Sequence, residues 1–246
     1  MDRMLYVAMN GAKQNMLAQS ANTNNLANVS TPGFRADFAS FRSMPVFGNG
    51  HPTRAYAMAE RPGVNLNPGV LNTTGNPLDI AIDGEGYIAV QAADGSEAYS
   101  RAGNMRLTTS GLLLSGTGEP VLGNAGPITL PPSRKIDIST EGIVSIIPLE
   151  QTEDTPQVVD RIKLVSPPPA SLFKGNDGLL RLKEGGQSPA NANVRVVSGS
   201  VEMSNVNIAE SLVNMIELAR QFELHVKMMK TAGDQAEQVS QLMRIG

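Results

Sequence analysis

The side chains that could carry out acid–base chemistry are few, and the closest group among them is Asp79, Asp83 and Glu85. A pair of carboxylates at the right separation is what glycoside hydrolysis needs, one as general acid and one as base or nucleophile. However, the aspartates alternate with apolar residues such as Ile80 and Ile82, which predicts a strand with Asp79 and Asp83 on its solvated face. Glu85 falls in a turn. We therefore expect no catalytic carboxylate pair and no enzyme.

The remaining candidates for chemistry are isolated in the sequence. His51 and His225 lack the neighbouring ligands of a zinc motif, and the chain has no cysteine. We expect both histidines to be solvated, and we expect neither a metal nor a cofactor. Residues 84–86 read Gly-Glu-Gly without the Lys and Ser/Thr of a phosphate-binding loop, so they indicate a turn.

Composition narrows the classes of partner. The formal charge of −3 provides no basic field for a phosphate backbone or an anionic membrane surface, so we expect no nucleic acid and no direct membrane insertion. No stretch is long enough to span a bilayer, and the N-terminus lacks the apolar core of a secretory signal. Composition alone would place the chain in the cytoplasm.

The first element with a clear period covers residues 2–28, which include no proline and one glycine. Its apolar positions Leu5, Met9, Ala12, Met16 and Leu26 fall on alternating steps of four and three, in which Gln19 and Thr23 fill the two remaining positions. This spacing predicts a helix of about 40 Å with one narrow apolar stripe. Residues 30–33, Ser-Thr-Pro-Gly, end it, because proline disfavours helix in the residue before it.

The last segment has a stronger version of the same pattern. Strict four-three spacing relates Ile208, Leu212, Met215, Ala219, Phe222, Val226, Met229, Gly233, Ala236, Ser240 and Met243. A period of 3.5 residues sustained over roughly five heptads favours a supercoiled seam over a helix packed on a broad core. Asn205 or Asn207 can cap its start.

Between these segments the period changes to two. Short apolar runs separated by Gly, Pro, Asn or Asp follow one another over residues 77–203, which predicts an antiparallel, barrel- or sandwich-like β domain. Residues 33–76 fit neither period and predict an extended connector. Phe34, Phe38 and Phe41 lie in it at helical spacing. Their rings either pack against their own chain or contact a neighbouring subunit.

The two terminal helices have apolar stripes that are too narrow to make a core alone. They bury these stripes most simply against each other, which leaves part of the C-terminal seam for other chains. Heterologous contacts repeated by a rotation that does not close build a helical polymer, so filament formation is one prediction. A closed bundle within a monomer or dimer is the alternative.

Several stretches resemble the flagellar basal-body rod and hook proteins. They are residues 24–35 (NNLANVSTPGFR), 75–82 (GNPLDIAI), 84–87 (GEGY), 99–104 (YSRAGN) and 204–223 (SNVNIAESLVNMIELARQFE). The first motif is specific, and the resemblance covers most of the chain, least from 148 to 193. The opening residues 1–9 and the chain length are most similar to the proximal rod members of this family.

The resemblance implies a structural subunit of the flagellar basal-body rod. The terminal helices would form the inner coiled-coil layer of a hollow helical rod that transmits motor torque through the periplasm, with the β domain outside. Its partners would be copies of itself, other flagellar rod proteins and the flagellar type III export apparatus. Export by that route uses no cleaved signal peptide, and it replaces the cytoplasmic prediction.

Two alternatives to a proximal rod subunit stay open. One is a distal rod or hook subunit of the same family. The other is a secreted β-rich glycan-binding module, which would need an exposed aromatic platform. Tyr87 and Tyr99 are the aromatic residues of the main β stretch that could supply one.

These expectations divide the α+β chain into four parts. Residues 1–32 and 204–246 form the two helices of a coiled-coil domain, residues 33–76 the connector and residues 77–203 the β-rich domain. The expected assembly seam consists of Leu5, Met9 and Met16 facing Leu212, Met215, Phe222, Val226 and Met229. The residues expected to fix the turn that leaves the first helix are Asn25, Asn28, Gly33 and Phe34.

Overall fold

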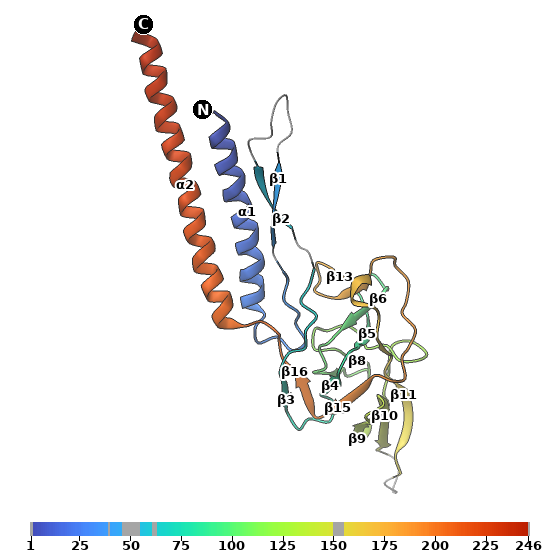
Figure 1. The fold of residues 1–246 in the computed structure, drawn as a ribbon. Coiled ribbons are helices and arrows are strands. Elements are labelled where there is room, and N and C mark those ends of the chain that lie inside the picture. Colours follow the sequence, from blue (N-terminus) through green and yellow to red (C-terminus); the bar gives the residue numbers. More distant parts are fainter. Residues whose placement is uncertain (1, 39, 46–54, 61–62, 150–154, 246) are drawn as a thin grey trace. The chain divides into compact units, whose positions relative to one another are not determined.

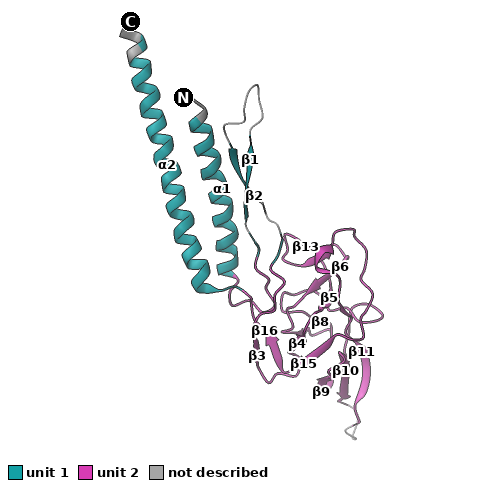
Figure 2. Cartoon of the chain, viewed as in Figure 1, with its two compact units in different colours: residues 1–27, 37–64, 206–246 teal, residues 28–36, 65–205 magenta. Residues whose placement is uncertain are grey.

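The computed structural model describes residues 2–38, 40–45, 55–60, 63–149 and 155–245 (Figure 1). Its two long helices are α1 (Asp2–Ala27) and α2 (Ile208–Ile245), and every described strand lies between them in sequence. The predicted α+β class with terminal helices and a β-rich middle is therefore confirmed. The chain forms two compact units (Figure 2). Unit 1 comprises residues 1–27, 37–64 and 206–246, and unit 2 comprises residues 28–36 and 65–205.

Unit 1 consists of the two helices and one hairpin. Helices α1 and α2 pack side by side and run antiparallel (Figure 1). Strands β1 (Ser40–Pro45) and β2 (Ala55–Glu60) pair antiparallel, and β2 packs on α1. Helix α2 is capped by Asn207, whose Oδ1 accepts hydrogen bonds from the N–H groups of Ala209 and Glu210 at 3.0 and 3.3 Å.

Unit 2 is built from antiparallel sheets. The largest has the order β12 (Leu164–Val165), β5 (Tyr87–Gln91), β6 (Glu97–Ser100), β14 (Leu180–Leu182) and β13 (Leu172–Lys174). A second sheet has the order β11 (Gln157–Arg161), β10 (Ile143–Pro148) and β9 (Ser133–Ile138). The two-stranded pairs are β4 (Ile80–Asp83) with β15 (Arg195–Ser198), β3 (Leu71–Thr73) with β16 (Ser200–Glu202), and β7 (Arg106–Leu107) with β8 (Leu113–Leu114). A short 3₁₀ helix, η1, covers Pro169–Ser171. Among the described strands, no sheet closes into a barrel.

The core of unit 2 is aliphatic and joins several of these sheets. Its fully buried members include Ile80, Ile88, Val90, Leu113, Val121, Ile128, Val144, Ile146 and Ile162. Strand β4 differs from the half-solvated strand that alternation predicted, because Ile80, Ala81 and Ile82 are all buried. Both faces of β4 are therefore covered by protein.

The range 33–76 differs from the extended connector that the sequence predicted. It contains the β1–β2 hairpin and strand β3, whose backbone groups are satisfied by strand pairing. Phe38 and Phe41 do not pack in a helical turn, and their side chains are 50% and 48% exposed. Local spacing missed these strands because each depends on a partner segment at least ten residues away.

Candidate functional site

The face of α1 that packs inside unit 1 is lined by small and polar residues. Its buried members are Ala8, Gly11, Ala12, Asn15, Ala18, Ala21 and Asn25. Such residues allow two backbones to approach closely. The long side chains of Leu5, Met9 and Met16 lie elsewhere on the helix and are 37%, 53% and 58% exposed. In the isolated chain, these three predicted seam residues therefore form an outer surface.

Helix α2 is turned so that its predicted seam divides between two faces. Its buried and half-buried positions at four-three spacing are Ser211, Met215, Leu218, Phe222, His225, Met229 and Ala232. The predicted seam residues Met215, Phe222 and Met229 belong to this inner stripe. Leu212 and Val226 do not, and they are 44% and 43% exposed. The role of all these residues in assembly stays a prediction.

The outer surface of the helices is unusually apolar for a chain on its own. Besides Leu5, Met9, Met16, Leu212 and Val226, its exposed large apolar side chains include Met4, Tyr6, Leu17, Ile208, Val213, Ile216, Leu224 and Met228. We call this set the outer apolar surface. Large apolar side chains that are exposed on the same helices are typical of sites that bind another protein.

Asn25, one of the predicted turn residues, holds the chain where it returns to unit 1. Its Nδ2 donates to the Asp37 carbonyl at 2.9 Å, and its Oδ1 accepts from the Asp37 N–H at 2.9 Å. A second amide of α1 binds the hairpin, because Asn10 Nδ2 donates to the Ala57 carbonyl at 2.7 Å. Asn10 thus anchors the hairpin to α1, and Asn25 anchors Asp37, which precedes the hairpin.

The other predicted turn residues, Asn28, Gly33 and Phe34, belong to unit 2. The Asn28 carbonyl accepts from the Thr31 N–H at 3.2 Å, which closes the turn after α1. Gly33 has a φ of +70°, and a Cβ there would lie 2.2 Å from the Ala102 nitrogen. Lys174 Nζ lies 4.1 Å from the centre of the Phe34 ring. Gly33 is therefore required both by its backbone conformation and by a close backbone approach.

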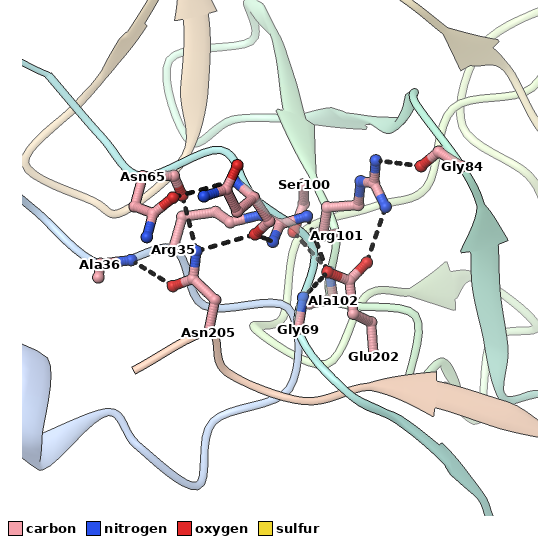
Figure 3. Close-up of polar contacts among 11 residues, drawn as sticks. Arg35, Ala36, Asn65, Gly69, Gly84, Ser100, Arg101, Ala102, Glu202 and Asn205 are labelled. Carbon is pink, nitrogen blue, oxygen red and sulfur yellow. Dashed lines mark hydrogen bonds and ion pairs between the residues drawn. The ribbon is translucent and has the colours of Figure 1, made fainter. Parts of the chain in front are cut away.

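Next to this turn, a buried ion cluster joins four segments of unit 2 (Figure 3). Glu202 pairs with Arg35 Nη2 at 2.8 Å through Oε1 and with Arg101 Nη1 at 2.7 Å through Oε2. Its Oε1 also accepts from the Gly69 N–H at 2.8 Å. All three charged side chains are at most 5% exposed. Burial lowers the pKa of the Arg35 guanidinium, an effect that the Glu202 carboxylate opposes.

Asn205 extends this cluster to the segments that lead out of unit 2. Its Oδ1 accepts from the Ala36 N–H at 2.8 Å, and its Nδ2 donates to the Asn65 carbonyl at 2.8 Å (Figure 3). The same Nδ2 donates to the Asn67 carbonyl at 2.9 Å. Arg35 Nη1 also donates to the Asn67 carbonyl. We call Arg35, Arg101, Glu202 and Asn205 the clasp. Its contacts join residues 35–36, 65–67 and 202–205 of unit 2, which lie next to three of the four points at which the chain passes from one unit to the other.

Sequence reasoning did not identify the clasp. Its members are separated by up to 170 positions, and no short-range spacing connects them. Three of the four do lie within the stretches that resemble the rod family, at residues 24–35, 99–104 and 204–223. Glu202 lies just outside the last of these stretches.

The three candidate acid–base carboxylates differ in their exposure to solvent. The prediction that Asp79 is solvated is wrong, because this carboxylate is buried and accepts hydrogen bonds from Thr74 Oγ1 at 2.6 Å and Asn76 Nδ2 at 3.1 Å. Asp83 and Glu85 are exposed. In the described part of the chain, no cluster of three metal-ligating side chains occurs.

The two histidines are placed differently from one another. His225 is half-buried on the inner face of α2 rather than solvated, and His51 lies outside the described residues. Tyr87 and Tyr99 are 6% and 1% exposed, so neither provides the aromatic platform that a glycan-binding module would need. No described helix is long and apolar enough to cross a membrane.

Family models match three regions of the chain. The model described as "Flagella basal body rod protein" matches residues 5–35, which cover most of α1 and the turn after it. "Flagellar hook protein FlgE/F/G D1 domain" matches residues 81–146 in unit 2. "Flagellar basal body rod FlgEFG protein C-terminal" matches residues 197–242, which include β16 and most of α2.

Several known proteins are similar to this chain over almost its whole length. The flagellar basal-body rod protein FlgF of Escherichia coli (strain K12) is 39% identical, with 99% of each chain covered. The FlgF protein of Salmonella typhimurium is 37% identical over the same shares. The rod protein FlgG of Bacillus subtilis is 31% identical, with 98% of this chain and 99% of the relative covered. With both helices, the turn and the β unit matched in this way, the chain belongs to the flagellar basal-body rod protein family.

Proposed function

We propose that this chain is a structural subunit of the bacterial flagellar rod that polymerises through its terminal helices. The observation that carries the proposal is the outer apolar surface of α1 and α2, which includes Met9, Met16, Leu212 and Val226 at 43–58% exposure. Covering these side chains with other subunits would remove apolar area from water, which favours association. A heterologous contact of this kind, repeated with a rise, produces a helical rod.

In such a rod, the helices would form an inner coiled-coil layer around a central channel. The four-three spacing of the α2 positions, which continues almost to the end of the helix, supports this arrangement. The clasp supports a mechanical role, because its buried ion pairs and hydrogen bonds hold together the ends of the two segments that form unit 2.

The proposal places the chain in the proximal part of the rod, surrounded by copies of itself and other rod proteins. The higher identity to the FlgF proteins than to the FlgG protein of Bacillus subtilis supports that position over a distal rod or hook subunit. Delivery to the periplasm would use the flagellar type III export apparatus without a cleaved signal peptide. The role is mechanical and involves no catalysis.

Single charges on α2 test the assembly surface. Val226→Asp puts a carboxylate on the outer apolar surface, where burial against another subunit would desolvate it. Gln221→Asp is the matched control, because it introduces the same charge at an exposed polar position of the same helix. Each variant is expressed in cells that lack the native gene, and mass spectrometry measures its amount in purified hook–basal bodies.

We expect both variants to fold, as judged by circular dichroism, and only Gln221→Asp to enter the rod and restore swimming. Incorporation of Val226→Asp at the native level would show that this surface is not an assembly contact. Electron microscopy of basal bodies from the deletion strain tests the wider proposal. Rings without a completed rod are expected, whereas complete flagella would reject a structural role in the rod.

A further inference from the structure

Helix α2 carries two overlapping stripes, either of which could face α1. Both contain Met215, Phe222 and Met229. One stripe adds Ser211, Leu218, His225 and Ala232, and the other adds Leu212, Ala219, Val226 and Gly233. In heptad geometry, the two settings differ by a rotation of α2 through about 50° around its own axis.

Apolar burial alone would favour the second stripe. The residues that it adds have no polar side chain, whereas the first stripe adds Ser211 and His225 beside Leu218 and Ala232. The structure nevertheless turns the first stripe inward, with Ser211 buried and His225 half-buried, and leaves Leu212 and Val226 exposed. A contact other than general hydrophobic burial must therefore select the setting.

Gly11 supplies a hole in α1 that receives the ring of His225. A Cβ at Gly11 would lie 2.4 Å from His225 Cε1, 2.8 Å from Nε2 and 2.9 Å from Nδ1. Gly11 is the only glycine of α1, so every other residue of the inner face carries a Cβ. A second contact favours the same rotation of α2, because Asn22 Nδ2 donates to the Ser211 carbonyl at 2.7 Å.

This setting leaves polar atoms without partners. His225 Nδ1 and Asn15 Nδ2 are buried and make no hydrogen bond to any described residue. Buried polar atoms without partners destabilise a fold. A polar residue at one position of a helix interface can specify a single arrangement at a cost in stability. His225 and Asn15 on the inner face of the helix pair fit this description, because they are polar residues that could specify one arrangement of the helices at a cost in stability.

We infer that the contact between Gly11 and His225 determines the rotation of α2 and so keeps Leu212 and Val226 on the outer surface. A subunit with α2 turned the other way would bury these two residues against its own α1 and present Ser211 and His225 to its neighbours. The consequence for assembly rests on the proposed function, because the residues kept outward are those that other subunits would cover.

Disulfide reporters can measure the rotation, because the chain has no cysteine. Asn22→Cys is combined with either Ser211→Cys or Leu212→Cys, two neighbours whose side chains point about 100° apart on a helix. Every variant then lacks the Asn22 contact, so differences between variants report the contact of Gly11 with His225. In the purified subunit, mild oxidation should form the disulfide to position 211 in excess over the disulfide to position 212. Gly11→Ala and His225→Ala should each lower this ratio by about tenfold, which corresponds to about 1.4 kcal/mol.

Gly233→Ala is the matched control, because it adds the same methyl group in a helix of the same pair at a place where a Cβ meets nothing within 4 Å. Its ratio should equal that of the native subunit. If Gly11→Ala forms neither disulfide, His225→Ala decides, because removing the ring introduces no clash. An unchanged ratio in His225→Ala overturns the inference. Since the reaction is read on free subunits, its outcome is independent of whether Val226→Asp enters rods.

Discussion

Replacing Glu202 by glutamine removes the single negative charge of the clasp while keeping the size of the side chain. In the native protein, its Oε1 forms an ion pair with Arg35 at 2.8 Å and accepts from the Gly69 N–H at 2.8 Å, and its Oε2 accepts from Arg101 at 2.7 Å. A glutamine amide presents an N–H₂ group in place of one of these acceptors, so one arginine would face another donor. Both guanidinium groups would be left buried without a counter-charge.

The burial of the clasp sets the size of the effect. Glu202 is 1% exposed, and the two arginine side chains are 3% and 5% exposed. Removing one partner of a buried ion pair typically costs about 3–5 kcal/mol. For a denaturant slope of about 2 kcal/mol/M, the urea midpoint would fall by about 1.5–2.5 M. Urea unfolding followed by circular dichroism measures the change, and hydrogen exchange of β5 and β6 reports it within unit 2.

An exposed ion pair of the same unit provides the control. Glu141 pairs with Arg195 at 2.9 Å, but both side chains are about half exposed, at 50% and 52%. Exposed pairs contribute less than about 1 kcal/mol, so Glu141→Gln should scarcely change the free energy of unfolding. If Glu202→Gln cost no more than Glu141→Gln, the clasp would not stabilise unit 2 in the way its geometry indicates.

Two further predictions concern the turn and the β core. Gly33→Ala should lower the free energy of unfolding by about 1–3 kcal/mol more than Gly75→Ala. The two glycines have similar φ values of +70° and +74°, but only at Gly33 would the added Cβ lie 2.2 Å from backbone atoms. Equal losses in urea unfolding would contradict the close approach. Burial raises the pKa of Tyr99 from 10.0 to about 12, so the stability that its neutral phenol contributes is fully present below pH 10.0 and is lost as pH rises through about 12. Burial also raises the pKa of Tyr87, so a near-ultraviolet titration should show a late tyrosinate step whose amplitude falls in Tyr99→Phe by that of one tyrosine, and an unchanged amplitude would refute the assignment.

The elements with a clear period could be predicted from the sequence. The heptad spacing of residues 208–243 predicted α2, and Pro32 and Gly33 marked the end of α1 within a few residues. Both depend on neighbours three or four positions away, which sequence spacing reveals. The β1–β2 hairpin was missed, because its strands are stabilised by pairing with each other and by packing on α1.

The candidate site was predictable only in part. The sequence identified the positions at which the helices carry large apolar residues, and it identified Asn25 and Gly33 in the turn. It did not indicate that Leu5, Met9 and Met16 would lie outside the helix pair. A prediction from hydrophobicity places the largest apolar side chains between the two helices. Helices whose backbones approach closely instead have small side chains between them, as α1 does.

The sequence by itself determined the class of the chain, with heptad-patterned helices at both ends, a β-rich middle, and motifs specific to one family. Only the tertiary structure decided which stripe of α2 faces inward and that Arg35, Arg101, Glu202 and Asn205 meet in one cluster. Sequence periodicity cannot distinguish two stripes of a helix that share residues. The choice between them depends on the shape of the partner surface, here the hole at Gly11. Ion pairs between distant segments have no sequence period at all, because their geometry exists only once the sheets have brought those segments together.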